Sequence, residues 1–207
     1  QEKTMKQICI IDYKLGNIAS IYNALKDLNQ NVIVSNIKGE ISKSSHIVLP
    51  GVGSFKQGMK GLKDLNLIEI LNEEVIDKKK YFLGICLGMQ LIASKSFEDG
   101  VTSGLDWIKG DVIKIIKTKN IKIPHMGWNE VNFSKSILYK GIKKFSSFYF
   151  VHSYYLKPKN NNIISGTCVH GDKITSSVEK DNIFATQFHP EKSHDVGLKL
   201  LKNFINN

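Results

Sequence analysis

The stretch "YFLGICLGMQL" at residues 81–91 places a cysteine between two glycines, where a strand-like run gives way to a helix-like one. The first five residues are mostly apolar, as in a buried strand, whereas the last five favour a helix. A buried cysteine usually lies inside a strand or helix as a small hydrophobic side chain. Cys86 instead lies at the junction, flanked by Gly84 and Gly88, which indicates a tight strand-to-helix turn.

Strand and helix patterns alternate through the first half of the chain. Apolar runs rich in β-branched residues predict buried strands, and apolar residues at helical spacing predict amphipathic helices, the first with Asn17 as its N-cap. Such alternation argues for parallel βαβ units. We expect strands at residues 6–13, 31–35, 46–50 and 81–85, a helix that follows Asn17 within residues 15–31, and helices at residues 67–80 and 87–96.

After Gly104 the pattern changes to short alternating segments that predict antiparallel strands, followed by a final helix at residues 195–205. No linker, repeat or low-complexity tract marks a boundary, so we expect one mixed α/β domain over residues 1–207. We also expect Met5 to be the natural start, with residues 1–4 added in cloning. The predicted antiparallel strands are residues 111–117, 148–156, 163–171, 173–180 and 183–190.

Composition narrows the class of protein. The net charge is +10, but the basic residues are all lysines spread along the chain, without the arginines and interleaved aromatics of a nucleic-acid-binding surface. Part of this charge can face an acidic partner. Three widely spaced cysteines and no signal peptide predict a reduced, cytoplasmic protein without disulfides, and no apolar run is long enough to cross a membrane.

Cys86 has the placement of a nucleophile. A strand-to-helix turn with small neighbours pushes the central side chain out at the carboxyl edge of a sheet, as in the G-x-S-x-G elbow. The amides at the start of the following helix favour the thiolate over the thiol. The alternative is a buried structural cysteine whose neighbouring glycines are incidental.

A cysteine nucleophile needs a base, and His189 in "QFHPEKS" is the strongest candidate. Pro190 should hold this stretch extended, so that His189 and Glu191, two residues apart, point to the same side. The carboxylate could then orient the imidazole, as in a catalytic triad. The alternative is that His189 fills a strand end and Glu191 caps the final helix.

The loop "PGVG" at residues 50–53 can complete such a site. A thioester-forming enzyme stabilises an oxyanion, usually with two backbone N–H groups. We expect Leu87, directly after the nucleophile, to supply one, and Gly51 and Val52 to supply the other, since glycine lets the backbone approach closely. Taken alone, the loop could equally be a turn that ends a strand.

Three motifs in this order, PGVG, G-x-C-x-G-x-Q and H-P-E, resemble those of the class I glutamine amidotransferases, the Cys-His-Glu glutaminases. Within that family the chain is most similar to the glutaminase subunits of imidazole glycerol phosphate synthases. The resemblance covers almost the whole chain and implies a three-layer α/β fold: a mixed, mostly parallel sheet flanked by helices, with added antiparallel strands. The further matching stretches are "DYKLGNIAS", "PHMGWNEV", "YFVHSYY" and "QFHPEKS".

The resemblance implies hydrolysis of L-glutamine to glutamate and ammonia. Cys86 would attack the side-chain amide, His189 would protonate the departing ammonia, and Gly53, Gly88 and Gln90 would bind the substrate. The ammonia would pass directly to a (β/α)8-barrel cyclase in a heterodimer, which makes imidazole glycerol phosphate and aminoimidazole carboxamide ribotide for histidine biosynthesis. No cofactor, metal, nucleic acid or membrane is implied.

The stretch "PHMGWNE" at residues 124–130 is unusually rich in large apolar residues for a turn. One interpretation is a local core plug, with Trp128 packed beneath the antiparallel strands. The other is a docking surface, since tryptophan and methionine are typical of interface centres. The resemblance adds that Asn17, Trp128, Tyr149 and Lys192 match the cyclase-facing surface of the family.

Two positions depart from the family pattern, which usually has glycine where this chain has Lys14 and Asp106. Both could lie on surfaces that tune the choice of partner. A paralogous glutaminase that supplies ammonia for amidation of bacterial surface sugars therefore remains an alternative, because a site fixes chemistry better than pathway. There are two further alternatives: another cysteine hydrolase of similar fold, and a binding module without activity.

Overall fold

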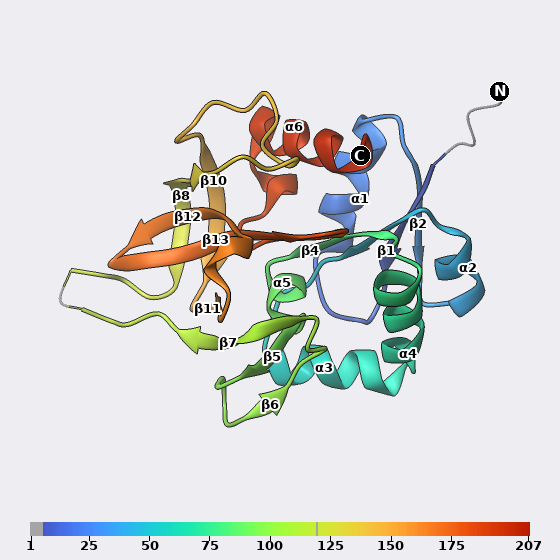
Figure 1. Ribbon diagram of the computed structural model, residues 1–207, viewed down its shortest axis with the longest axis horizontal. Coiled ribbons are helices and arrows are strands. Elements are labelled where there is room, and N and C mark those ends of the chain that lie inside the picture. The colour runs from blue at the N-terminus through green and yellow to red at the C-terminus, as the bar shows by residue number, and fades with distance from the viewer. Residues whose placement is uncertain (1–5, 119) are drawn as a thin grey trace.

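The computed structural model describes residues 6–118 and 120–207, so the expected start at Met5 lies outside the described residues. The centre is an eight-stranded sheet, in which strands distant in sequence lie side by side (Figure 1). Its order is β2 (Asn31–Ser35), β1 (Gln7–Ile11), β3 (His46–Leu49), β4 (Tyr81–Ile85), β14 (Ile183–Thr186), β13 (Asp172–Lys180), β12 (Ile164–His170) and β9 (Asn132–Phe133).

The sheet is mixed and mostly parallel, as expected. The five strands from β2 to β14 run parallel, while β13, β12 and β9 continue the sheet in antiparallel pairing. The return strand β14 joins the two halves, because it pairs parallel with β4 and antiparallel with β13. The carboxyl ends of β3, β4 and β14 therefore meet at one edge, which is where the three predicted motifs lie.

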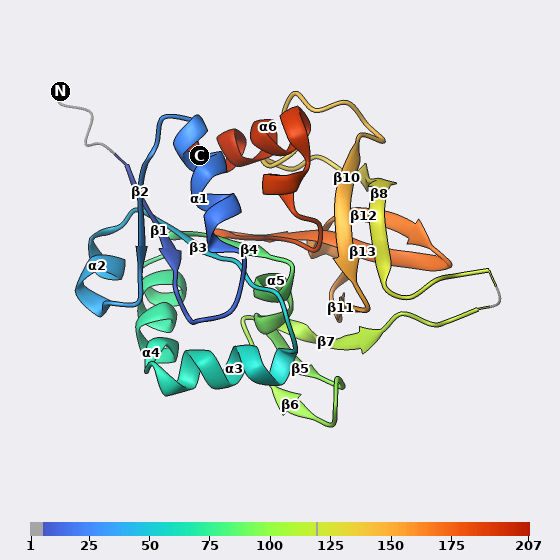
Figure 2. The ribbon, with the colours of Figure 1, turned by 180° about the vertical axis from the view of Figure 1, so that it is seen from behind.

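Helices cover both faces of the sheet (Figures 1 and 2). Alternate residues of β1 point to opposite faces: Ile8 packs with α1 (Ile18–Asp27) and α6 (His194–Ile205). Cys9 packs with the apolar cluster on the other face, which includes α3 (Phe55–Asp64), α4 (Leu67–Leu71) and α5 (Leu87–Leu91). This confirms the three-layer fold. No helix within the described ranges is both long and apolar enough to cross a bilayer.

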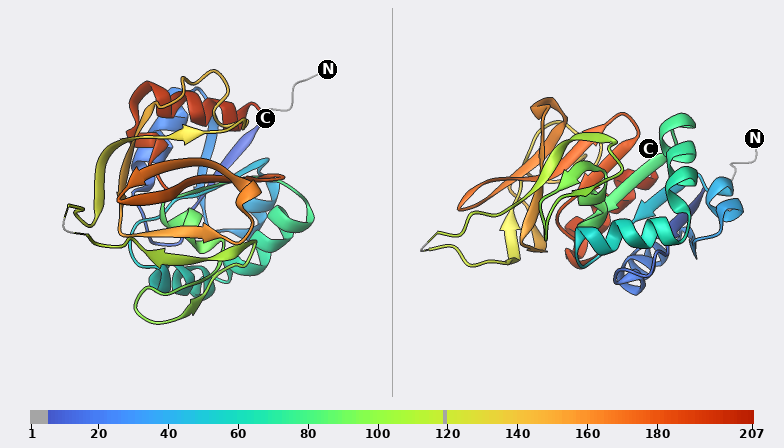
Figure 3. Two further views of the ribbon diagram at one scale, coloured as in Figure 1. Left: turned by 60° about the vertical axis from the view of Figure 1, so that its left-hand side comes forward. Right: turned by 90° about the horizontal axis from the view of Figure 1, so that it is seen from below.

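Two smaller sheets lie at the end of the molecule opposite α2 (Lys38–Lys43) (Figures 1 and 3). One has four strands, and the other is a two-stranded antiparallel ribbon of β10 (Ser147–His152) and β8 (His125–Glu130). The first has the order β11 (Tyr154–Pro158), β7 (Ile108–Lys114), β5 (Ala93–Ser96) and β6 (Thr102–Ser103). The predicted strand at residues 148–156 is thus two strands that belong to different sheets.

Three predicted helices end earlier than expected, the first of them at Asp27. The helix at residues 87–96 ends at Leu91, because Ala93–Ser96 pairs with β7 and β6 as strand β5. The helix at residues 67–80 changes at Asn72 into a π-helical segment, Asn72–Asp77. In the helix at residues 87–96, tertiary pairing outweighs local helix propensity.

The helix α3 was not predicted, although its sequence carries a start signal. Ser54 accepts a hydrogen bond from the amide of Gln57 at 3.3 Å, which satisfies one free donor of the first turn. The Ser-x-x-Gln spacing at residues 54–57 is the capping-box pattern, hidden beside the more conspicuous PGVG loop.

The two departures from the family pattern share one backbone property. Lys14 has φ +67° and Asp106 has φ +59°, both in the left-handed region that glycine adopts without a Cβ penalty. A side chain there costs about 1 kcal/mol. Asp106 offsets part of this cost by accepting a hydrogen bond from Ser94 at 2.6 Å and pairing with Lys109. Both residues are exposed, and their effect on partner choice stays a prediction.

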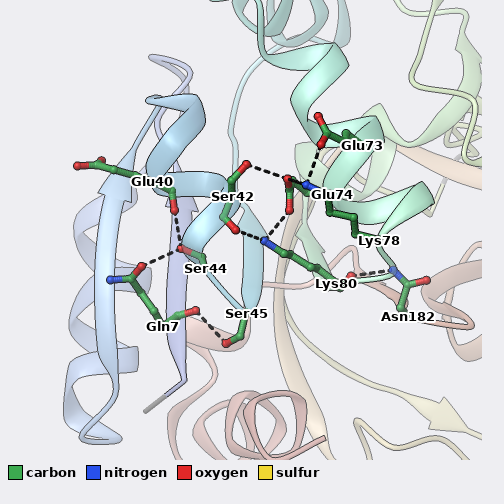
Figure 4. A network of polar contacts seen from close by, with 10 residues as sticks. All are labelled: Gln7, Glu40, Ser42, Ser44, Ser45, Glu73, Glu74, Lys78, Lys80 and Asn182. Atoms are coloured by element: carbon green, nitrogen blue, oxygen red, sulfur yellow. Dashed lines mark hydrogen bonds and ion pairs between the residues drawn. The ribbon is translucent and has the colours of Figure 1, made fainter. Parts of the chain in front are cut away.

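The buried carboxylate of Glu74 contacts side chains from neighbouring segments beside α2 (Figure 4). The Glu74 side chain is fully buried in the π-helical segment, with Lys78 Nζ 2.7 Å from Oε1 and Lys80 Nζ 2.5 Å from Oε2. Ser42 of α2 donates to Oε1 at 2.8 Å. Burial by itself raises the pKa of Glu74, but these hydrogen bonds outweigh it and hold the pKa below its usual value.

We predict that Glu74→Gln lowers the free energy of unfolding by about 3 kcal/mol, because it leaves Lys80, whose side chain is 17% exposed, without a counter-charge. The depressed pKa means that the stabilisation is present above pH 4.5 and is lost as the pH falls through the folded-state pKa. Urea unfolding at pH 7 and in acid measures both effects.

Glu73→Gln is the matched control. Glu73 also pairs with Lys78, at 2.7 Å, but its side chain is 52% exposed. It should change stability by no more than about 0.5 kcal/mol. Equal losses in the two variants would show that burial of Glu74 does not matter.

Candidate active site

Cys86 lies on a strained turn between β4 and α5. Its backbone has φ +53° and ψ −108°, a conformation that a side-chain-bearing residue rarely adopts. The amides of Met89 and Gln90 donate to its carbonyl at 3.1 and 3.2 Å, so the helix starts directly at the cysteine. This is the geometry that the glycine pattern predicted for a nucleophile elbow.

The two flanking glycines are required by close backbone packing. A Cβ atom on Gly84 would lie 2.7 Å from the carbonyl oxygen of Gly88, and one on Gly88 would lie 1.8 Å from the carbonyl oxygen of Leu49 in β3. Gly88 was predicted to bind substrate, but it packs against β3 and is not among the residues that line the cavity described below. The structure therefore gives Gly88 a packing role.

His189 and Glu191 are brought together as predicted. Nδ1 of His189 lies 2.7 Å from Oε1 of Glu191, and their side chains are only 3% and 4% exposed. The route differs from the expected one: His189 is extended, but Pro190 starts a 3-10 turn, Pro190–Lys192, that brings Glu191 back to the imidazole. The amide of His189 donates to Tyr149 of β10 at 2.9 Å, which anchors the turn.

The surroundings of His189 favour its charged form. Burial lowers the pKa of a histidine, but here the nearby groups of Cys86 and Glu191 outweigh burial and raise the pKa of His189 to about 10. Within the described residues, Nε2 is buried and has no hydrogen-bond partner at ordinary distance, although Cys86 is near enough to act on it. His189 is therefore able to give a proton to a group held beside Cys86.

Gln187 contacts the nucleophile and was missed by the sequence analysis. Its Nε2 donates to Sγ of Cys86 at 3.6 Å, and its Oε1 accepts from Gln90 Nε2 at 3.1 Å. Gln187 thus links the nucleophile to Gln90. The signal was available, because Gln187 and His189 are two residues apart in "QFHP" and so share one side of an extended chain.

The other two cysteines have no such support. Cys9 lies in β1 and Cys168 in β12, both buried. Burial raises the pKa of Cys9 to about 12 and that of Cys168 to about 11, so both remain neutral thiols. This agrees with the expectation that they are inert.

A cavity of about 300 Å³ opens at Cys86. Most of the predicted oxyanion and substrate residues border it, together with residues 151–154 of the "YFVHSYY" stretch, which were not predicted as site residues. Glu98 is the one carboxylate among the lining residues, and its Oε2 accepts from the amide of Phe55 at 2.8 Å. The lining consists of Val52, Gly53, Cys86, Leu87, Gln90, Glu98, Val151, His152, Ser153 and Tyr154.

The predicted oxyanion donor is not free. The amide of Leu87 donates to the carbonyl oxygen of Gly51 at 3.2 Å in this conformation, so its role as an oxyanion donor stays a prediction. The loop is held by Tyr13, whose hydroxyl donates to Pro50 at 2.5 Å. A Cβ on Gly51 would lie 1.9 Å from that hydroxyl, which explains the glycine.

Three of the four predicted interface residues gather on the outer face of the β10–β8 ribbon. Trp128 is 49% exposed, so the core-plug interpretation is wrong. Its indole stacks on His194 with ring centres 5.1 Å apart and meets Tyr149 edge-on at 6.1 Å, while Lys192 Nζ lies 6.0 Å from the centre of the Tyr149 ring. We call Trp128, Tyr149, Lys192 and His194 the aromatic face. It is continuous with the turn that carries His189 and Glu191.

Asn17, the fourth interface candidate, occupies the N-cap position of α1 as predicted, but its side chain makes no capping hydrogen bond. It is exposed, and α1 packs beside the turn Pro190–Lys192. Its side chain is thus available for an external contact.

Solved structures with this fold include glutamine amidotransferases. The chain superposes on "PurLQS from Thermotoga maritima" with a TM-score of 0.74 at 16% identity, covering 98% of this chain and 99% of that one. It superposes on a glutamine amidotransferase from the same organism with a TM-score of 0.62 at 20% identity, covering 97% of this chain and 81% of that one. At these identities the likeness concerns the fold.

Sequence relatives are closer. Over 200 residues the chain is 51% identical to "Imidazole glycerol phosphate synthase subunit HisH 1" of Campylobacter jejuni, covering 96% of this chain and 98% of that protein. It is 46% identical to subunit HisH of Pelagibacter ubique, covering 96% and 99%. Residues 9–207 match the family described as "Glutamine amidotransferase class-I". The chain therefore belongs to the class I glutamine amidotransferases and, within them, to the HisH subunits of imidazole glycerol phosphate synthase.

Proposed function

We propose that the chain is the glutaminase component of an imidazole glycerol phosphate synthase and acts in histidine biosynthesis. It hydrolyses L-glutamine to L-glutamate and ammonia, and the ammonia is delivered to a cyclase subunit. The observation that carries the proposal is that Cys86 opens onto a cavity and is contacted by Gln187 and by the His189–Glu191 pair, in a chain 51% identical to a HisH subunit.

The first half of the reaction uses Cys86 and His189. The thiolate of Cys86 attacks the side-chain amide carbon of glutamine, and the C–N bond breaks as His189 donates its proton to the departing nitrogen. Ammonia and a glutamyl thioester result. The raised pKa of His189 keeps the imidazole protonated for this step, and Glu191 holds Nδ1 so that Nε2 faces the reacting atoms.

The second half releases glutamate. His189, now neutral, takes a proton from water, whose oxygen attacks the thioester carbon. The C–S bond breaks and Cys86 leaves as the thiolate, paired again with the protonated imidazole. No cofactor or metal is needed, because the nucleophile, acid and base are all side chains of this subunit.

The cavity fits glutamine at both ends. Glu98 offers negative charge to the α-ammonium group, and Gln90 and the backbone of Gly53 offer polar contacts near the same wall. The side-chain amide would then extend toward Cys86. Glu98 thus joins the predicted substrate residues, although nothing in its local sequence distinguishes it from a surface carboxylate.

The oxyanion site is closed in the conformation seen here. Rotation of the Gly51–Val52 peptide would withdraw the Gly51 carbonyl from Leu87 and turn the Val52 N–H inward, which would provide two donors for the oxyanion. Such a subunit is nearly silent alone and becomes active when the partner favours the rotated peptide. Losing one oxyanion donor typically costs about 10²–10³ in kcat.

We further propose that the partner is a (β/α)8-barrel cyclase, bound in a cytoplasmic heterodimer through the aromatic face and Asn17. Ammonia in bulk water is protonated and lost as a nucleophile, so direct transfer to the cyclase requires docking beside Cys86. Lys192 directly follows Glu191, and an acidic residue of the cyclase could pair with it and thereby couple docking to the catalytic turn.

A second candidate function is supply of ammonia to a different synthase, such as one that amidates bacterial surface sugars. Several relatives are numbered copies, including HisH 1 of Campylobacter jejuni and HisH 2 of Pseudomonas aeruginosa, the latter 44% identical. Organisms with two copies can use them with different partners. Measuring which of two candidate synthases activates glutamine hydrolysis separates these functions.

We predict that Cys86→Ser lowers glutamine hydrolysis in the presence of the cyclase by at least about 10³-fold, since a serine hydroxyl is a poor nucleophile with this base. Labelling by the glutamine-like electrophile diazo-oxo-norleucine should disappear with it. Cys168→Ala is the control and should keep both properties. Labelling that persists in Cys86→Ser and maps to Cys9 or Cys168 would refute the assignment.

We predict that Glu191→Gln retains more activity than Cys86→Ser or His189→Ala and changes the pH dependence. Without the carboxylate the imidazolium is less stabilised, so the pKa of His189 falls. The alkaline limb of kcat/KM should therefore move to lower pH by about 1 unit or more. The measurement is a pH profile from 6 to 10 with the cyclase present. An unmoved alkaline limb would mean that Glu191 does not control His189.

We predict that Trp128→Ala weakens binding to the cyclase by about 30-fold, the effect of losing a 2 kcal/mol interface residue, while Tm of the free subunit stays the same. Calorimetric titration and thermal melting measure the two. Ile37→Ala is the control, because Ile37 is 58% exposed beside α2 at the opposite end of the molecule. Normal binding of Trp128→Ala would remove this residue from the interface.

A further inference from the structure

The inner face of the β10–β8 ribbon carries two buried histidines to which the reaction above gives no role. His125 of β8 and His152 of β10 lie opposite each other in the ribbon and are 4% and 6% exposed. The ring of His125 is stacked on Phe150 with centres 4.6 Å apart and on His170 with centres 4.1 Å apart. Stacking on two rings fixes the plane of the His125 imidazole.

Hydrogen bonds determine which nitrogen of each ring carries the proton. The carbonyl oxygen of Tyr154 can only accept, so His152 donates to it from Nδ1 at 2.8 Å. Nε2 of His152 is then an acceptor, and His125 donates to it from Nδ1 at 2.9 Å. Nε2 of His125 in turn accepts from Nδ2 of Asn129 at 3.1 Å. The hydrogen bonds therefore run in one direction, from Asn129 to Tyr154.

The end of this chain meets the glutamine site. The same Tyr154 carbonyl accepts a second hydrogen bond, from Nε2 of Gln90 at 2.9 Å. The other N–H of that amide donates to Oε1 of Gln187 at 3.1 Å. Both donors of Gln90 are thus used within the protein, which leaves its Oε1 as the group that can accept from a substrate in the cavity that Gln90 lines. An oxygen in this place suits an ammonium group.

We propose that His125 and His152 are positioning residues for glutamine binding: their one-way hydrogen-bond chain fixes the Tyr154 carbonyl, which holds the Gln90 amide with its oxygen toward the substrate. The proposal rests on the proposed glutaminase function. It assigns the histidines no direct part in bond breaking, and it predicts effects on KM rather than on kcat.

The pKa values of His125 and His152 agree with the direction of this hydrogen-bond chain. Burial lowers the pKa of His125 to about 3 and that of His152 to about 4, with further lowering by neighbouring histidines, including His170 for both rings and His189 for His152. The hydrogen bond from His152 to Tyr154 opposes this only in part. Both rings are therefore neutral at pH 7. If Nε2 of His152 carried a proton, its N–H would face the Nδ1–H of His125, and the hydrogen bond between the two rings would be lost.

The test compares two amides at one position. In His152→Asn the side-chain nitrogen can take the place of Nδ1 and keep the donor to Tyr154, whereas in His152→Gln it takes the place of Nε2 and loses that donor. With the cyclase present, we expect His152→Gln to raise KM for glutamine about tenfold with kcat changed less than about twofold, as for the loss of one hydrogen bond. His152→Asn should stay within about threefold of wild type.

Two further variants separate positioning from general damage. His125→Phe keeps the stacked ring but removes the donor to His152, and it should raise KM in the same way. His170→Phe keeps the stacking on His125 while lying outside the chain of hydrogen bonds, and it should leave KM unchanged. Alkylation of Cys86 by iodoacetamide, which needs no glutamine site, should have the same rate in all four variants, whereas labelling by diazo-oxo-norleucine should slow only in His152→Gln and His125→Phe.

Each outcome decides between the two proposals. If the wild-type protein does not hydrolyse glutamine in the presence of the cyclase, the proposed function is refuted, and the positioning role is refuted with it. An active wild type with equal KM values for His152→Asn and His152→Gln overturns the positioning role alone. Should melting show that the His152 variants do not fold, an unchanged KM in His125→Phe overturns it instead.

Discussion

The close crossing of α5 over β3 is the constraint on which the site depends. A Cβ atom on Gly88 would have no space beside the carbonyl oxygen of Leu49, and a Cβ atom on Gly84 would have almost none beside the carbonyl oxygen of Gly88. These contacts force the chain to turn sharply after β4, and the turn puts Cys86 in a conformation that exposes its sulfur to the cavity. The strain at Cys86 is sustained because the two parallel strands beside it, β3 and β14, hold β4 from both sides. A looser crossing would release the turn and withdraw the nucleophile.

Around this turn, side-chain N–H donors lie near the sulfur of Cys86, and the side-chain oxygen of Gln90 is left free to accept from a substrate in the cavity. Gln187 and His189 direct N–H groups toward Cys86, whereas Gln90 is held by its nitrogen and keeps its oxygen for the cavity. In a buried site such fixed dipoles act more strongly than in water and need no reorganisation during the reaction. Two carbonyl groups act in the opposite sense: that of Val151 lies 3.9 Å from Sγ of Cys86, and that of Gly51 accepts from the Leu87 amide. The proposed oxyanion site therefore depends on the orientation of the Gly51–Val52 peptide.

The β10–β8 ribbon has a different task on each face. Alternation along the strands places Trp128 and Tyr149 outward, and His125, Phe150 and His152 inward. The outward residues form the aromatic face, and the inward ones reach the wall of the glutamine cavity through Tyr154. Only a few residues therefore separate the aromatic face, proposed to dock the cyclase, from the groups proposed to contact substrate. Pairing of Tyr149 with His189 adds a third connection, from the same strand to the catalytic turn.

By itself, the sequence determined the fold class, the elbow at Cys86 and the pairing of His189 with Glu191, because each depends on local patterns: hydrophobic periodicity, small residues beside a nucleophile, and two side chains two residues apart. The 3-10 turn that brings these two side chains together was seen only in the structure. It did not determine that Ala93–Ser96 is a strand, that the Leu87 amide is bonded to the Gly51 carbonyl, that Glu98 lines the cavity, or that Gln187 contacts the sulfur of Cys86. Those facts depend on partners tens of residues away in the chain, and local propensity is weak against such pairing. His125 and His152 show the difference most clearly. In the sequence they are two separate histidines, and only their opposition across the ribbon makes them one chain of hydrogen bonds with a direction.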